Sequence, residues 1–109
     1  MASIDDFSKL DIRVGEIVRA EEFPKAKNPS YQLWIDFGGE LGILKSSAQI
    51  TEQYTTDSLI GKQVVGIVNF PPRQVANFMS QVLILGACTD SGVILLRPES
   101  AVALGTAVH

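Results

Sequence analysis

The 109-residue chain has one cysteine, one histidine and no long apolar run. Cys88 has no partner for an intramolecular disulfide, and with His109 alone it cannot form a transition-metal site. A Ser-His or Cys-His catalytic pair is not expected either, because His109 is the C-terminal residue. No apolar stretch approaches the roughly 18 residues that a membrane helix needs, so we expect no membrane insertion.

Motifs for catalysis and cofactor binding are also missing. The glycines form no phosphate-binding loop, and the adjacent acidic pairs Asp5-Asp6 and Glu21-Glu22 are not convincing acid/base groups. We therefore predict a protein that is not an enzyme and that uses no metal and no cofactor. The acidic start of the chain is unlike a signal peptide. Together with the single cysteine, it predicts a cytoplasmic protein in a reducing compartment.

Charge is modest and unevenly distributed. Nine basic residues against twelve acidic ones give a net charge of -3. Residues 1–22 carry most of the acidic excess, whereas the middle of the chain, residues 23–81, is slightly basic. Any surface that faces an anion is therefore expected to come from the middle of the chain.

The hydrophobic fraction of 46% and the length predict one globular domain over residues 1–109. Ser3 followed by Asp6 resembles a capping box and predicts a helical turn over residues 4–10. Ile4, Phe7 and Leu10 then form one apolar stripe.

From Asp11 onward the hydrophobic period is two, which is typical of strands. The alternation slips near Gly15, where we expect a bulge or bend. A hairpin is predicted over residues 30–46. Within residues 50–62 the cluster Thr55-Thr56-Asp57 fits an N-cap and predicts a short helical turn. Further strands are predicted over residues 64–69, 82–87, 93–96 and, more weakly, 106–108. Short strands with one helical insert between the third and fourth predict an all-β fold, a small Greek-key barrel of the OB type.

Two features rise above this background. Residues 69–80 form a loop that carries two aromatic side chains and Arg73, which follows a rigid Pro-Pro pair and should lie in solvent. Phe70 and Phe78 either contact a ligand or close one end of the barrel. The second feature is an aromatic side chain on the face of the hairpin: alternation directs Trp34 outward, but a slip in a curled strand would expose Phe37 instead.

Several runs resemble the tRNA-binding-domain family, whose members include domains appended to methionyl- and phenylalanyl-tRNA synthetases. They are residues 11–18, 64–69 and 80–87, and the resemblance covers nearly the whole chain. Residues 4–7, 21–24, 46–51 and 68–73 are similar to a group of export-related chaperones within that family.

The resemblance implies an OB-fold homodimer that binds unfolded or precursor polypeptides, tRNA, or both. Family members dimerise through their terminal segments, so it also implies an interface of apolar residues: Ile4, Phe7, Leu10, Val102, Leu104 and Val108. Where RNA-binding members carry a basic stretch after the Pro-Arg pair, this chain has Gln74-Val75-Ala76-Asn77, while the serine of the motif is kept as Ser80. Fewer cations weaken RNA binding and favour an apolar peptide.

The sequence predicts one ligand groove in each protomer, lined by Trp34, Phe37, Lys45, Asn69, Phe70, Arg73, Phe78 and Ser80. Two alternatives remain open. Instead of a chaperone-type protein, the chain could be an RNA-binding cofactor whose peptide binding is incidental, or a structural dimer that docks on a larger partner.

Overall fold

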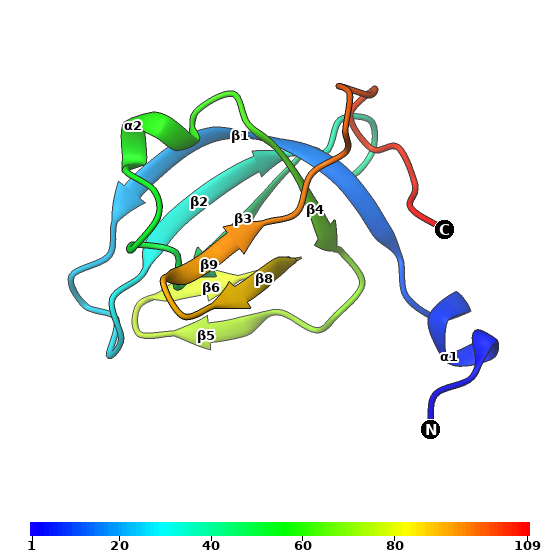
Figure 1. Ribbon diagram of the computed structural model, residues 1–109, viewed down its shortest axis with the longest axis horizontal. Coiled ribbons are helices and arrows are strands. Elements are labelled where there is room, and N and C mark those ends of the chain that lie inside the picture. The colour runs from blue at the N-terminus through cyan, green and yellow to red at the C-terminus, as the bar shows by residue number, and fades with distance from the viewer.

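A computed structural model describes all 109 residues as a small barrel of short strands with two short helices (Figure 1). The elements in chain order are α1 (Ile4–Ser8), β1 (Ile12–Glu22), β2 (Tyr31–Asp36), β3 (Ile43–Ala48), α2 (Thr56–Leu59), β4 (Gln63–Ile67), β5 (Arg73–Val75), β6 (Phe78–Ser80), β7 (Leu83–Ile84), β8 (Gly86–Thr89) and β9 (Gly92–Leu95).

One antiparallel sheet forms most of the barrel, in the strand order β3-β2-β1-β4-β7. The hairpins β5–β6 and β8–β9 are separate two-stranded sheets. The barrel closes where the backbone amides of Gln81 and Val82 donate hydrogen bonds to the Lys45 carbonyl. Because α2 lies between β3 and β4, the predicted all-β, OB-like fold with its helical insert is confirmed.

Both helices begin at the residues that the sequence indicated. Ser3 and Thr55 are the N-caps, and each forms a reciprocal capping box with the residue three positions later. Helix α1 ends at Ser8, two residues before the predicted residue 10, although the amides of Lys9 and Leu10 still donate to the carbonyls of Asp6 and Phe7. No helix in the structure is long and apolar enough to cross a membrane.

The bulge in β1 lies at Val18, between Ile17 and Arg19, and not at Gly15 as the sequence suggested. Gly15 instead provides space: a Cβ there would approach Ile35 Cγ2 at 2.7 Å and Phe37 at 2.8 Å. The backbone pairing of β1 with β4 continues through Gly15 without a shift. The glycine therefore permits close packing inside the barrel, while Val18 produces the slip in alternation.

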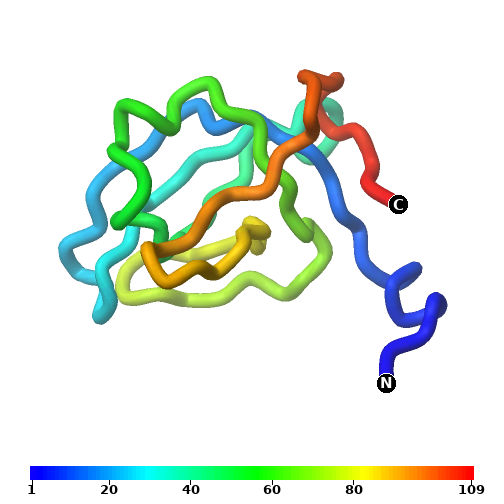
Figure 2. The backbone as a smooth tube through the Cα atoms, in the orientation of Figure 1, coloured from blue at the N-terminus to red at the C-terminus, as the bar shows by residue number.

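The core is formed by nine buried residues from the inner faces of the strands and the α2 segment: Ile17, Tyr31, Leu33, Ile35, Phe37, Ile50, Leu59, Val64 and Val82. The strand predicted over residues 82–87 is divided into β7 and the start of β8. The weak strand at residues 106–108 is a single bridge between Arg13 and Ala107. Figure 2 shows the N-terminal helix projecting from the same end of the barrel at which the chain finishes.

Candidate functional site

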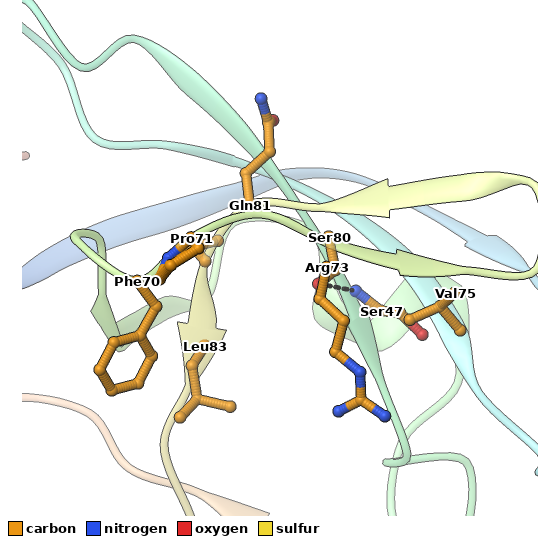
Figure 3. Close-up of a pocket in the computed structure, with 9 residues that line it drawn as sticks. Ser47, Phe70, Pro71, Arg73, Val75, Ser80, Gln81 and Leu83 are labelled. Carbon is orange, nitrogen blue, oxygen red and sulfur yellow. Dashed lines mark hydrogen bonds between the residues drawn. The ribbon is translucent and has the colours of Figure 1, made fainter.

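The segment between β4 and β7 folds back over the edge of β3 and contains the hairpin β5–β6, where the sequence predicted only a loop. The Ser80 hydroxyl oxygen accepts a hydrogen bond from the Ser47 amide at 3.0 Å (Figure 3). The Gln81 side-chain oxygen accepts one from the Lys45 amide at 3.0 Å, and the Gln81 amide donates to the Lys45 carbonyl at 2.7 Å. These bonds fix the base of the hairpin against β3.

A pocket of about 260 Å³ lies beside this contact. In Figure 3 the side chains of Phe70, Arg73 and Leu83 extend to one side of the segment, whereas Gln81 points to the other. Leu83 and Phe70 are 50% and 43% exposed, so their apolar surface is accessible. The complete lining is Ser47, Phe70, Pro71, Arg73, Val75, Ser80, Gln81, Val82 and Leu83.

Arg73 supplies the one positive charge in the pocket lining. It is exposed and takes part in none of the three ion pairs of the structure. Because the Ser80 hydroxyl oxygen only accepts from the Ser47 amide, its proton remains available for donation. The pocket therefore combines apolar walls with a guanidinium and a hydroxyl donor, which suit an anionic group attached to an apolar one.

An aromatic cluster of Phe23, Trp34 and Phe78 lies on the outer face of the β1–β2–β3 sheet. The Phe78 ring makes edge contacts with Phe23 and Trp34, with centroids 5.5 Å and 5.6 Å apart. Lys45 Nζ lies 5.0 Å from the centroid of Phe78, and the Arg19 guanidinium lies 4.2 Å from the centroid of Trp34. The outer face is thus a set of aromatic rings covered by two cations.

Phe78 is 6% exposed, so it anchors β6 on the sheet and presents little surface to a ligand. Its burial fits a structural role, although the ring packs against Phe23 and Trp34 outside the barrel and does not close one of the barrel's ends. Trp34 points outward, as alternation predicted, whereas Phe37 is 1% exposed and belongs to the core. Phe37 is therefore excluded from the predicted groove, because its ring fills the barrel next to Gly15.

Asn69 also has a structural position. Its side-chain oxygen accepts a hydrogen bond from the Asp11 amide at 2.9 Å, and its side-chain nitrogen donates to the Lys9 carbonyl at 2.8 Å. Both ends of the amide are used to hold the N-terminal segment against the end of β4. Asn69 does not line the pocket, so the prediction that it contacts the ligand there is not supported by its geometry.

The eight residues expected in one groove therefore lie in different parts of the structure. Phe70, Arg73 and Ser80 line the pocket, while Trp34 and Lys45 lie with the aromatic cluster. Sequence reasoning missed the six other lining residues: Ser47, Pro71, Val75, Gln81, Val82 and Leu83. Ser47 could have been found, because it lies two residues after Lys45 and so shares its strand face. Leu83 gave no such signal within its apolar run.

A second hollow, the terminal hollow, has a volume of about 430 Å³ and lies between the two ends of the chain. Ile4, Phe7, Leu10 and Val108 line it together, and Ile4 is 77% exposed. The other two expected interface residues lie elsewhere. The Val102 backbone bonds the Gln63 side chain, and the Leu104 side chain lies beside Gly38.

Titratable groups add little to either site. Burial raises the pKa of Tyr31, and the nearby Glu22 carboxylate acts in the same direction. The Tyr31 hydroxyl donates to the Tyr54 carbonyl at 2.7 Å, so this side chain joins the core to the α2 segment. No three His, Cys, Asp or Glu side chains gather in a way that suits a metal ion.

Residues 12–107 match the family model described as putative tRNA binding domain. The chain is 42% identical over 106 residues to the methionine–tRNA ligase of Archaeoglobus fulgidus and 36% identical over 108 residues to that of Methanococcus aeolicus. These matches cover 97% and 99% of this chain, but only 16% of each ligase. The chain therefore corresponds to a small part of those enzymes.

Two solved structures match the chain from end to end. The CsaA chaperone protein from Picrophilus torridus is 49% identical with a TM-score of 0.95, and the alignment covers 100% of both chains. The chaperone CsaA from Bacillus anthracis is 48% identical with a TM-score of 0.93, covering 100% of this chain and 99% of that one. The resemblance to a chaperone group within the family is confirmed by these two matches.

The different burial of the two phenylalanines in the β4–β7 segment is testable. Phe78→Ala should lower the free energy of unfolding by about 3–5 kcal/mol, because it removes a buried ring and leaves a cavity. Phe70→Ala should change it by less than about 1 kcal/mol, since that ring is largely in solvent. Urea unfolding of both variants measures the difference, and equal losses would contradict the anchoring role of Phe78.

Proposed function

The chain belongs to the putative tRNA-binding-domain family, and from this premise we propose that it is a non-enzymatic, chaperone-type homodimer. It binds unfolded or precursor polypeptides in protein export and takes tRNA as a second ligand. The observation that carries the proposal is the open apolar pocket with its single arginine. End-to-end similarity to two CsaA chaperones supports the same proposal.

The pocket suits a segment of extended polypeptide. Phe70, Val75 and Leu83 offer apolar contact, and Arg73 attracts a carboxylate. Burial of such surface contributes about 25 cal/mol per Å², which after the cost of ordering a flexible peptide leaves affinity in the micromolar range. Because most of this contact is apolar, binding should tolerate salt.

The outer face supports the tRNA-binding function. Arg19 and Lys45 cover the aromatic cluster, and Lys25 and Lys27 lie exposed in the loop after β1 without forming an ion pair. Loops that flank this face are where OB-folds bind oligonucleotides. Since the basic stretch expected in RNA-binding members is absent, we assign tRNA to the second place.

The terminal hollow supports dimerisation. Its apolar side chains, above all Ile4 and Phe7, are exposed in the single chain. A second copy related by a two-fold axis would cover both hollows with the same residues, as in isologous dimers. The alternative is a dimer that docks on a larger partner and binds neither ligand. The following measurements would reveal it as a dimer with no affinity for peptide or tRNA.

For polypeptide binding, the test is the affinity of a fluorescein-labelled unfolded apolar peptide, measured by anisotropy. Phe70→Ser should weaken binding by roughly tenfold or more, because it removes apolar area from the pocket. Met79→Ser is the matched control: Met79 is 38% exposed, lies on the hairpin and does not line the pocket. Equal effects of the two substitutions, or none, would show that the peptide binds elsewhere.

For tRNA, the measurement is a titration with bulk tRNA at about 50 and about 200 mM salt. If several phosphates are contacted, affinity should fall by roughly tenfold or more between the two conditions. Lys27→Glu, on the outer face, should weaken binding further, whereas Arg97→Glu, a charge reversal at another hollow, should have little effect. Affinity that is independent of salt would rule out this phosphate-binding surface.

For the dimer, light scattering after gel filtration should give twice the chain mass of 11.8 kDa. Phe7→Ser with Ile4→Ser should produce a folded monomer, because both side chains face the terminal hollow. Ile43→Ser is the control, since this exposed isoleucine lies on β3, outside the hollow. A native monomer, or a dimer that survives the double substitution, would refute this interface.

A further inference from the structure

The hairpin β8–β9 presents a strand edge that nothing in the chain covers. Its strand β8 pairs with β9 only, and all four of its residues are exposed. We propose that this edge of β8 captures a segment of extended polypeptide as an added β-strand. The inference deepens the proposed polypeptide-binding function and rests on it.

The register of the hairpin identifies the free backbone groups. Thr89 and Gly92 face each other across a two-residue turn, so this closing pair exchanges both backbone hydrogen bonds. Bonded and non-bonded pairs then alternate, and the bond from the Leu96 amide to the Leu85 carbonyl at 3.1 Å has the expected phase. The amides and carbonyls of Gly86 and Cys88 therefore point away from β9, and because β8 pairs with β9 alone they face no partner strand.

These four groups have the spacing of a β-ladder, which is the chemistry that an extended peptide backbone recognises. An added strand would pair with Gly86 and Cys88 and leave the bonds between β8 and β9 intact. Backbone pairing depends little on sequence, which suits a protein that binds unfolded chains of many kinds.

The side chains around the edge favour an uncharged segment. Neither strand contains a charged residue or a proline, which are the usual devices that protect an exposed edge from pairing. On the outer face Ala87 lies opposite Ile94, which is 41% exposed. Alternate side chains of an added strand would pack there, so an apolar segment is preferred.

The edge is also continuous with the pocket. Leu83 lines the pocket and is followed, after two residues, by Gly86 at the start of β8. One extended segment can therefore place a side chain against Leu83 while its backbone pairs with β8. This connection favours a polypeptide ligand over a second copy of the chain, whose paired edge would leave the pocket unused.

The test is hydrogen exchange by NMR at single amides, with a labelled nine-residue peptide of alternating valine and serine. In the free protein the Gly86 and Cys88 amides should exchange rapidly, while the Ala87 amide is protected by β9. Saturating peptide should slow exchange at Gly86 and Cys88 by roughly tenfold or more and leave Ala87 unchanged. The same peptide N-methylated at two consecutive central residues, which blocks both of its edges, should not protect them.

Two substitutions at one position complete the test. Cys88→Pro removes the outward amide without removing a bond to β9, and should weaken the peptide by roughly tenfold. Cys88→Val keeps the amide and should bind as the native protein does. Thermal unfolding of the native protein and both variants verifies that the hairpin is intact, and the exchange data on the native protein stand independently of it.

The remaining outcomes separate the two proposals. If the peptide binds and protects only amides of residues 70–83, the edge inference is wrong and the proposed function stands. If no peptide binds at all, both fail. If Gly86 and Cys88 become protected with rising protein concentration in the absence of peptide, the occupant is a second copy of the chain and the inference is overturned.

Discussion

Closure of the barrel at the edge of β3 determines where the rest of the molecule can bind a ligand. As the terminal strand of the main sheet, β3 would leave its outer backbone groups unpaired. Ser80, Gln81 and Val82 bond three of those groups, the amide and carbonyl of Lys45 and the amide of Ser47, using backbone and side-chain atoms together. To reach them the chain must leave β4 and return across β3, and the pocket lies beneath that crossing. The pocket is therefore a consequence of how an OB-like barrel closes.

In the segment between β4 and β7, Phe78 has a structural role that its predicted position on a loop did not indicate. Phe78 packs between Phe23 and Trp34 and fixes β6, and β6 in turn holds β5 with Arg73. The cation is thereby held at the pocket without an acidic partner of its own. A buried ring thus determines the position of an exposed charge, which explains why removing Phe78 is expected to affect stability before it affects binding.

Local patterns in the sequence predicted local structure well. The cap residues Ser3 and Thr55 mark both helix starts, and the period of two places Trp34 outside the barrel. The failures concern contacts between distant parts of the chain. Asn69 appeared to be a free polar side chain in a loop, but its partner Asp11 is 58 positions away. The slip in alternation did reveal a bulge in β1, but its position at Val18 and the burial of Phe78 depend on neighbours from other strands.

The strand edges of β3 and β8 differ in whether the chain covers them. The edge of β3 is covered within the chain, whereas that of β8 is open and carries no charge. An open edge invites aggregation, yet here it is only four residues long and ends at a turn containing Asp90. Two outward-facing residues, Gly86 and Cys88, can hold one segment of a flexible chain but provide too short a template for a stacked sheet. A short unprotected edge is therefore compatible with a protein that binds unfolded chains reversibly and remains dispersed.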